Sequence, residues 1–385
     1  MSGKEDLLQP GFVERRRHPR VSNAPLGVDK ERKGVLVPLR FGTAELPKSQ
    51  QFPAWQEHMA PVLDCRLPDG TDIQNGFIVQ QTVWNLGGML VVQETVPAYG
   101  YERSPQKIRF SPIDHWRIAF LRSGRTWTEV DGHVAQNEPG MMEVRSLGRP
   151  FRGRSLAVTT ISLVIPVDLF FDQGGLPPAS NNAVIGGHRV SLLLDYLSSV
   201  EANLERFTHD DLAVVKVRLQ EMVFDAVTAL VDRTESKDQL SQVGLMTRAR
   251  RFIQNNISSP DLNIDILCKE LAISRTRLYE LFEVTGGVAN YIRRRRLLTA
   301  HAMLADPTGS QKIADIGLAI GIESSANFSR TFTQYFGYSP SSVYRKNSIV
   351  DQIPPAERGI IKDYHQHTFE GLLRTLGLFL IARLA

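Results

Sequence analysis

The sequence predicts an α+β protein of two domains, an amino-terminal β-barrel with a helical hairpin and a carboxy-terminal domain built only of helices. Three observations support this fold class. The chain has 385 residues, more than the roughly 250–300 residues at which one hydrophobic core usually stops growing. Short segments typical of strands fill one stretch of the chain, and helical periodicity fills the next. Apolar residues make up 42% and charged residues 22%, as in ordinary globular proteins.

The domain boundaries follow from changes in composition and periodicity. The first stretch is rich in Pro, Gly and charge, including the basic run "ERRRHPR", and has no sustained period, which is typical of a flexible segment. In chain order we expect a flexible leader at residues 1–55, the β-rich domain with its hairpin at 56–233, a linker at 234–244, the helical domain at 245–346 and a tail of unknown role at 347–385.

The β-rich part runs from about Pro61 to Pro166. Its segments "RIAFLRSG", "TWTEVDGHV", "GMMEVRS" and "LAVTTISLVIP" are short and carry aromatic or β-branched residues. The turn dipeptides Ser-Gly, Asp-Gly and Pro-Gly separate them at the ~8–12-residue spacing that is typical of a sandwich or barrel. No helix of useful length is expected there.

Two helices are expected next. Apolar residues recur at helical spacing in "HRVSLLLDYLSSVEANLERF" and in "DDLAVVKVRLQEMVFDAVTALVDR", and the Thr-His-Asp-Asp break between them supplies an N-cap. The pair could cover an open barrel or associate with a second subunit.

Composition argues against several other classes of protein. Cys65 and Cys268 are the only cysteines and show no pairing pattern, which fits a reducing cytoplasm. The amino terminus lacks the apolar core of a secretory signal, and the apolar run from Gly371 to the end is shorter than the ~20 residues that span a bilayer. We therefore expect a cytoplasmic protein without a membrane partner.

No pattern of catalytic or metal-binding residues stands out. The barrel region has His115 and His133 without a His-x-His pair, and the one His-x-His motif, at residues 365–367, falls in the tail. Phosphate-binding glycine loops, nucleophile elbows and Cys/His clusters are missing from the sequence. We therefore expect no metal, no cofactor, no catalytic residue and no enzymatic activity.

Charge is concentrated in the helical domain. Residues 245–346 contain 14 Lys/Arg and 8 Asp/Glu, an excess of +6, whereas the whole chain carries only +4, so the remainder carries −2. A basic domain on a near-neutral remainder is typical of a polyanion partner, most often nucleic acid.

The helical domain repeats one plan at an offset of 49 residues, in "IDILCKELAISRTRLYELF" and "IADIGLAIGIESSANFSRTF". Each copy has a small residue (Cys268, Gly317), a tight turn, a serine that can cap a second helix, and an apolar pair at i,i+4 in that helix. This is the pattern of a helix-turn-helix, and its duplication argues against two ordinary hairpins with polar faces.

Residues near the start of each second helix should face the DNA bases in the major groove, where Arg suits guanine and Asn suits adenine. Phosphate contacts should come from residues that flank these positions. The candidates that face bases are Arg275, Thr276, Arg277, Tyr279, Ser325, Ala326, Asn327 and Arg330. The candidates for phosphate are Ser274, Ser324, Arg294 and Arg295.

The segments "LAISRTRLYELFEVTG", "YIRRRRLLTAHAML", "KIADIGLAIGIESSANFSRTFTQYFGYSP" and "SSVYRK" resemble the DNA-binding domain of the AraC/XylS family of bacterial transcription regulators, over about 100 of the 385 residues. The resemblance implies a DNA reader with two motifs in one chain that contacts promoter DNA and RNA polymerase, in a bacterial nucleoid. Glu280, Ala272 and Ile322 depart from the family pattern, so we expect the second motif to match its contacts better than the first.

The same resemblance implies that the β-rich domain is a cupin-like sensor that binds a small-molecule effector and forms a homodimer through the helices at about 187–232. Residues that could line an effector pocket are Trp116, Arg117, Phe120, Trp127 and Met142, with Arg117 or Arg122 available for a carboxylate; each could also be ordinary barrel core. We expect an effector-controlled regulator, with activation as the expected sign. The alternative is a DNA-binding regulator whose barrel is a ligand-free protein-interaction module.

Four arginines in succession, residues 293–296, lie within an expected helix. At about 100° per residue, Arg293 and Arg296 fall within the apolar stripe, whereas Arg294 and Arg295 fall outside it and should face solvent or phosphate. Arg296 matches an arginine that the family commonly keeps in the helix linking its two motifs, which fits a structural ion pair at least as well as a contact with DNA. The helix should therefore act mainly as a spacer between the two reading helices.

Overall fold

The computed structural model describes residues 34–111, 113–173, 175–231, 237–283, 286–305, 311–322, 324–343 and 368–376. The expected leader up to residue 33, the linker residues 234–236 and the tail residues 347–367 and 377–385 lie outside the described residues, and so do the basic run and the His-x-His motif.

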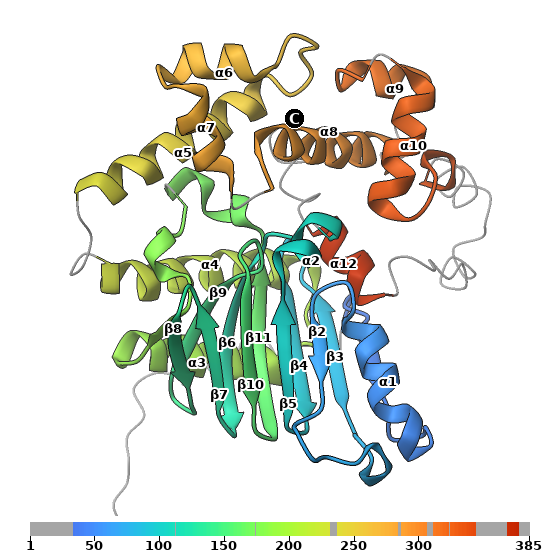
Figure 1. The fold of residues 1–385 in the computed structure, drawn as a ribbon, viewed down its shortest axis with the longest axis vertical. Helices are drawn as coiled ribbons and strands as arrows, with labels where there is room; N and C mark the ends of the chain where they lie inside the picture. The colour runs from blue at the N-terminus through green and yellow to red at the C-terminus, as the bar shows by residue number, and fades with distance from the viewer. Residues whose placement is uncertain are drawn as a thin grey trace, which may run out of the picture.

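The amino-terminal domain consists of two antiparallel sheets that face each other as the sides of an open barrel, called the barrel below (Figure 1). The first sheet has seven strands in the order β1-β3-β4-β11-β6-β9-β12, and the second has five in the order β2-β5-β10-β7-β8. The strands are β1 Leu39–Gly42, β2 Asp64–Arg66, β3 Gln80–Asn85, β4 Leu90–Val96, β5 Tyr99–Arg103, β6 Trp116–Ser123, β7 Thr126–Val130, β8 His133–Asn137, β9 Met142–Ser146, β10 Phe151–Ser155, β11 Val158–Ile165 and β12 Ala183–Ile185.

The expected Asp-Gly turn joins β7 to β8. Val130 pairs with His133 across it, so the loop consists of Asp131 and Gly132 alone, with φ of 51° and 80°. Positive φ at both central residues is the requirement of a two-residue hairpin turn that matches strand twist. The expected turn is therefore confirmed, and it joins two paired strands as a hairpin.

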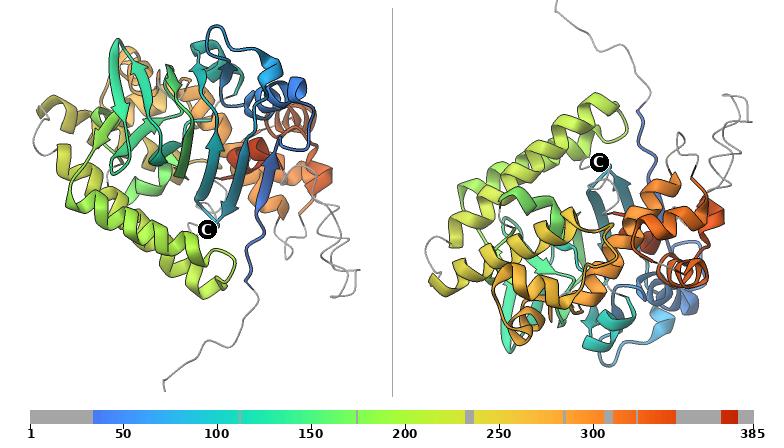
Figure 2. Two further views of the ribbon diagram at one scale, coloured as in Figure 1. Left: turned by 90° about the horizontal axis from the view of Figure 1, so that it is seen from below. Right: turned by 90° about the horizontal axis from the view of Figure 1, so that it is seen from above.

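The helical hairpin covers the outer face of the seven-stranded sheet, as Figure 2 shows for the paired helices α3 (His188–Asn203) and α4 (His209–Val231). Thr208 and Asp211 cap α4 reciprocally, since Asp211 Oδ2 accepts from the Thr208 backbone N at 2.8 Å and Thr208 Oγ1 accepts from the Asp211 backbone N at 3.4 Å. This confirms the predicted hairpin and its capping residues.

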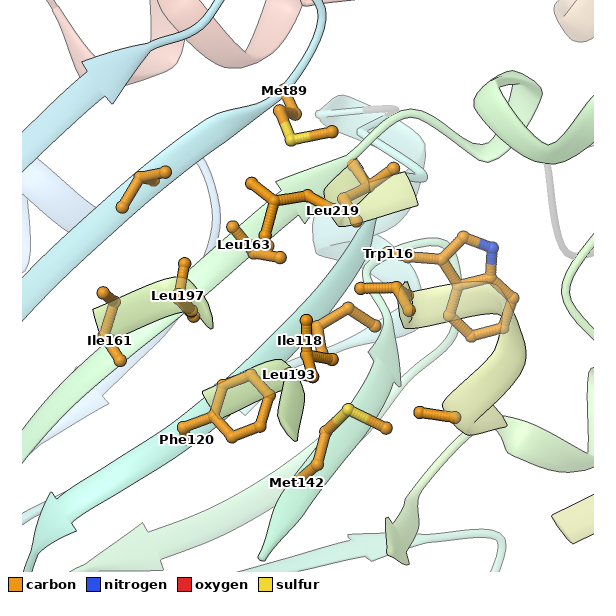
Figure 3. Packing of buried hydrophobic residues seen from close by; sticks show 14 of the residues in the cluster. Met89, Trp116, Ile118, Phe120, Met142, Ile161, Leu163, Leu193, Leu197 and Leu219 are labelled. Carbon is orange, nitrogen blue, oxygen red and sulfur yellow. The ribbon is translucent and has the colours of Figure 1, made fainter. Parts of the chain in front are cut away.

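Figure 3 shows the apolar core between this sheet and the hairpin, in which Ile118, Phe120 and Leu163 of the strands meet Leu193 and Leu197 of α3. The side chains are almost fully buried. A second core lies between the two sheets, inside the barrel. Strand residues alternate between the two cores because successive side chains of a strand point to opposite faces.

Two expected boundaries were wrong. The leader was expected to extend to residue 55, but β1 pairs with β3 and α1 (Lys48–Met59) buries Phe52 and Trp55, so ordered structure begins well before that. The linker was expected to end at residue 244, but α5 (Lys237–Asn255) already includes its last eight residues. In both places tertiary packing or helix extension recruits segments of weak local pattern.

The carboxy-terminal domain has two lobes joined by one helix. The first lobe contains α5, α6 (Ile264–Leu271) and α7 (Arg275–Phe282), and the second contains α9 (Ile313–Ala319) and α10 (Ser325–Phe336). The central helix α8 (Val288–Ala305) supplies Tyr291 and Ile292 to the first core and Leu297 onward to the second. Its role as a spacer is therefore visible in the packing.

A short helix of the tail, α12 (Phe369–Thr375), lies between the barrel and α10 (Figure 1). Its Phe369, Leu372 and Leu373 belong to the core inside the barrel. The described part of the tail thus packs on the body of the protein. No helix in the described part of the chain is both long and apolar enough to cross a membrane.

Candidate DNA-reading surface and barrel cavity

The two reading helices, α7 and α10, begin with the expected serine caps. Ser274 Oγ accepts from the Arg277 backbone N at 3.1 Å, and Ser324 Oγ accepts from the Asn327 backbone N at 3.3 Å. A capping hydroxyl satisfies a backbone N–H that the helix itself leaves unpaired. Both helices are also held by the predicted apolar pairs, Leu278/Phe282 and Phe328/Phe332, all of which are fully buried.

The residues expected to face bases lie on the outer surface of the two helices. All are exposed except Arg277, which is half-buried; the exposed members are Arg275, Thr276, Tyr279, Ser325, Ala326, Asn327 and Arg330. In the first helix, Arg275 pairs with Asp265 at 2.5 Å, and Arg277 pairs with Glu280 at 3.0 Å. The candidate reading residues of α7 are therefore partly engaged by neighbouring carboxylates.

The turns before α7 and α10 differ in backbone strain. Ala272 adopts φ 55° and ψ 44° at the end of α6, the left-handed conformation that costs a residue with a Cβ about 1–2 kcal/mol. Gly321 occupies the matching place in the second motif with φ 74° and carries no such cost. The departure seen in the sequence at Ala272 is therefore a real strain in the first motif.

The expectation that Arg294 and Arg295 face solvent or phosphate was wrong. Their exposed fractions are 9% and 3%, because the barrel covers the face of α8 that points away from both helical cores. Arg293, which was placed in the apolar stripe, is the exposed arginine of the run. A helix covered on three sides has no single apolar stripe, so its periodicity was misleading.

Two ion pairs fasten α8 to the barrel. Arg294 Nη2 lies 2.6 Å from Asp114 Oδ2, and Arg295 Nη1 lies 2.7 Å from Asp168 Oδ2. Asp168 also accepts a hydrogen bond from the Tyr291 hydroxyl at 3.0 Å. Buried, hydrogen-bonded pairs of this kind position domains, because losing one partner leaves the other charge uncompensated.

The carboxylates of this interface are held ionised. Burial alone would raise the pKa of Asp168, but Arg295 and then Arg250 outweigh it and lower the pKa from 3.8 to about 2. Burial likewise opposes ionisation of Asp114, and Arg294 overcomes it, so the pKa of Asp114 is also lowered. Neighbouring cations therefore dominate over desolvation at both sites.

Arg103, which the sequence did not single out, supports this interface from inside the barrel. Its guanidinium is fully buried and donates to the carbonyls of Leu147, Val62, Ser111 and Ile113 at 2.6–3.0 Å. Ser111 and Ile113 immediately precede Asp114, so Arg103 fixes the segment that presents this carboxylate. A basic residue in an alternating strand gives no sequence pattern from which this role could be predicted.

Arg296 has a structural role, through backbone carbonyls rather than through the ion pair that was expected. Its guanidinium donates to the carbonyls of Ile257, Ser259 and Gly321 at 2.6–3.2 Å. A Cβ on Gly321 would lie 2.7 Å from Arg296 Nη2. Arg296 thus ties the first lobe to the turn of the second motif, and the glycine leaves room for it.

The barrel encloses a cavity of about 60 Å³. Charged and aromatic side chains of both sheets line it, together with two side chains of α12. The lining includes Glu94, Tyr99, Tyr101, Arg117, Glu143, Arg145, Phe151, Ser155, Ser162, Phe369 and Leu373.

Of the five expected pocket residues, only Arg117 lines this cavity. Trp116, Phe120 and Met142 point to the opposite face and pack under the helical hairpin. Trp127 lies outside as well, with its indole N donating to Gln136 at 3.1 Å and Arg154 over its ring. Four of the five therefore lie outside this cavity, because neighbouring residues of a strand point to opposite faces and a shift of one residue exchanges the cavity for the outer core.

Opposite charges are balanced within the cavity. Arg117 lies 3.4 Å from Glu94 and 3.7 Å from Glu143, and Arg145 pairs closely with Glu143. Burial raises the pKa of Glu143, but Arg145 and Arg117 together overcome this and hold it below its ordinary value. Arg122, the other arginine considered for a carboxylate, instead pairs with Glu201 on the surface at 2.8 Å.

Comparison with known proteins agrees with this architecture. A helix-turn-helix domain family matches residues 267–347. The crystal structure of the AraC-like transcriptional activator CuxR is 45% identical, with 68% of this chain and 94% of that chain covered and a TM-score of 0.52. The chain belongs to the AraC/XylS family. Such a member is a DNA-binding transcription regulator, so DNA is its partner.

Other family members are more distant. The transcriptional activator NphR of Rhodococcus is 23% identical over 259 residues, which is 65% of this chain and 75% of the relative. The Msm operon regulatory protein of Streptococcus mutans is 31% identical over 103 residues, and the chain spans only 36% of its length. These relatives are regulators rather than enzymes, which fits a non-enzymatic protein. Within the described residues, His, Cys, Asp and Glu side chains form no group of three that could hold a metal ion.

Proposed function

We propose that this AraC/XylS family member is a transcription activator that reads promoter DNA with α7 and α10, under the control of a small, uncharged polar molecule bound in the barrel cavity. The observation that carries the proposal is the pairing of two capped, outward-facing reading helices with a buried polar cavity on the other side of α8. Its two domains are joined through α8 and α12, so an occupant of the cavity can affect the DNA-binding domain.

The reading surface comprises the exposed first turns of the two helices. Arg275, Arg277 and Arg330 supply guanidinium groups for guanine, and Asn327 supplies an amide for adenine. Ser274 and Ser324 lie beside the free backbone N–H groups of the helix starts, which favour phosphate. Arg293 replaces Arg294 and Arg295 as the phosphate candidate on α8, since it is the exposed arginine of that run.

The chemistry of the cavity favours a neutral ligand. Two arginines and two glutamates balance, so a charged ligand would leave one buried charge uncompensated. Polar atoms nevertheless remain available, because Ser155 Oγ, Ser162 Oγ and Arg145 Nε are buried without a hydrogen-bond partner. Hydroxyl or amide groups of a ligand can satisfy them, and the rings of Tyr101 and Phe151 offer apolar contact.

The proposal includes a homodimer and a contact with RNA polymerase. Support for the dimer comes from α3 and α4, which expose Leu192, Val214 and Val217 with 59%, 62% and 43% of their surface accessible. Apolar side chains gathered on one helical pair are typical of a protein interface. Sedimentation equilibrium of the whole chain measures this association directly.

A thermal-shift screen of the whole chain tests the effector. The panel contains neutral polyols, sugars and amides beside carboxylic acids and amines of similar size. We expect neutral polar compounds to raise the melting temperature, since a ligand at 100 times its Kd stabilises by ~2.7 kcal/mol. Ser162→Val should abolish the shift, whereas Thr159→Val, on the opposite face of β11, should leave it unchanged. A response confined to the acids would contradict the charge argument, and no response would favour the ligand-free interaction module.

A further inference from the structure

The tail helix α12 closes the open end of the barrel. Phe369 and Leu373 are part of the cavity lining, and every other lining residue lies between Met59 and Val164. Phe369 stacks on the His58 ring at 5.8 Å, and His115 Nε2 hydrogen-bonds to the Leu373 carbonyl at 2.8 Å. The end of the barrel therefore forms a binding site for a helix, called the helix site below, with apolar contacts and one directed hydrogen bond.

The sequence of α12 has the amphipathic pattern that this helix site requires. Phe369, Leu372, Leu373 and Leu376 lie at i, i+3, i+4 and i+7, and all four are buried. Thr368 caps the helix by accepting from the Gly371 backbone N at 3.1 Å. This is the pattern by which amphipathic helices bind apolar grooves.

The same helix touches the DNA-binding domain. Arg374 donates to the Tyr335 carbonyl in α10, and its guanidinium lies 5.7 Å from the centre of the Tyr335 ring. Leu373 and Arg374 also border the small cleft that Asp114, Asp168, Arg294 and Arg295 line. α12 therefore contacts the barrel interior, the second reading lobe and the ion pairs that fasten α8.

The room left inside the barrel shows what α12 excludes. About 60 Å³ remains open with α12 in place, well below the ~150 Å³ of an engineered protein cavity that admits benzene. A sugar or amide of ten heavy atoms does not fit this volume. Removing Phe369 and Leu373 enlarges the cavity and opens it at the end that faces the DNA-binding domain.

We propose that the open end of the barrel is a binding site for an amphipathic helix and that α12 occupies it as a built-in, displaceable ligand. Binding of α12 at this helix site and entry of a small molecule into the cavity exclude each other. Dissociation of α12 from the helix site also removes the Arg374–Tyr335 contact. Entry of a small molecule therefore weakens the attachment of the second lobe to the barrel. Because coupling between two ligands is reciprocal, binding of α12 at the helix site lowers the affinity of the cavity for the small molecule. This gating role rests on the effector site proposed above.

Competition between α12 and a synthetic peptide tests the helix site in the absence of DNA and effector. The probe is a fluorescein-labelled synthetic peptide of residues 366–378, followed by anisotropy. The wild-type chain should bind it at least tenfold more weakly than the full-length Leu373→Asp chain, whose own α12 cannot bury the carboxylate. A peptide carrying the same substitution should not bind. Full-length Val134→Thr, altered at an exposed residue of β8, should behave as the wild type.

The exclusion itself is tested with a neutral, apolar fluorescent dye, N-phenyl-1-naphthylamine. Its fluorescence should rise at least severalfold with the Leu373→Asp chain, and added peptide should reverse the rise. Simultaneous binding of dye and peptide would contradict the mutual exclusion. A folded Leu373→Asp chain that does not bind the peptide would contradict the helix site. If circular dichroism shows that this variant is unfolded, Phe369→Ala in the full chain gives the same two readouts. If only the thermal-shift screen fails, the proposed effector is contradicted, whereas the proposed helix site still stands.

Discussion

The two lobes of the DNA-binding domain follow one plan but differ in strain, in the freedom of their reading residues and in how the barrel holds them. The first lobe has a strained turn at Ala272 and a candidate reading arginine, Arg275, that is paired with Asp265. The second has the unstrained Gly321, and no described carboxylate pairs with Arg330. A duplicated motif therefore need not contribute equally to recognition.

The attachments of the lobes to the barrel differ as well. Asp168 binds Arg295 and Tyr291 and lies 4.0 Å from Arg250, all of which belong to the first lobe or its end of α8. The second lobe contacts α12 through the Tyr335 carbonyl. Buried ion pairs thus hold the first lobe, in which the candidate Arg275 is paired, and a short helix contacts the second lobe, in which no described carboxylate pairs with the candidate Arg330.

The largest expected effect concerns the first attachment. Asp168→Asn should lower the free energy of unfolding by about 3 kcal/mol, since Arg295 would stay buried without its counter-charge. Asp265→Asn, which breaks an exposed pair, should cost less than about 1 kcal/mol. Urea unfolding at pH 7 measures both; equal losses would show that the buried attachment adds no more stability than the surface pair.

The pH dependence of the same difference has a definite sign. The pKa of Asp168 is lowered from 3.8 to about 2 in the folded protein, so the ion pair stabilises fully above pH ~4 and less as the pH falls through 2. The stability gap between the wild type and Asp168→Asn should therefore narrow between pH 4 and pH 2 and stay constant above.

The second effect concerns DNA discrimination. Arg330→Ala should reduce the preference for the bound promoter site over a single-base variant by ~1–3 kcal/mol if it contacts a base. Arg275→Ala should reduce it by less than about 1 kcal/mol, because any base contact of Arg275 competes with the Asp265 pair. Anisotropy titrations measure both, with Gln334→Ala at the far end of α10 as the unchanged control. A larger loss for Arg275 would reverse the ranking of the two readers.

The smallest effect concerns the turns. Ala272→Gly should stabilise the protein by roughly 0.5–1 kcal/mol, because glycine relieves the left-handed strain. Gly321→Ala should destabilise it by about 1 kcal/mol, since it adds that strain and meets Arg296 Nη2 at 2.7 Å. Melting temperatures compare the two; shifts of the same sign would contradict the difference between the turns.

Much of the fold could be predicted from local patterns. The Asp131-Gly132 turn, the caps at Ser274, Ser324 and Thr208, and the buried aromatic and leucine pairs of the reading helices follow from interactions within a few residues, which a sequence displays directly. The cavity could not be predicted in the same way. Trp116, Phe120 and Met142 are as apolar as any cavity lining, and which face of a strand looks inward depends on what covers the other face.

The arginine run shows where prediction from one chain segment ends. Its place in a helix, its spacer role and the structural use of Arg296 follow from the sequence and the family plan. The burial of Arg294 and Arg295 depends on Asp114 and Asp168, which lie more than a hundred residues earlier in the chain. The position of α12 likewise depends on the shape of the barrel end. Local propensity and periodicity set each helix and its capped, exposed reading turn, whereas contacts between distant segments decide which charges are buried and what closes the cavity, because those contacts exist only after the domains have packed.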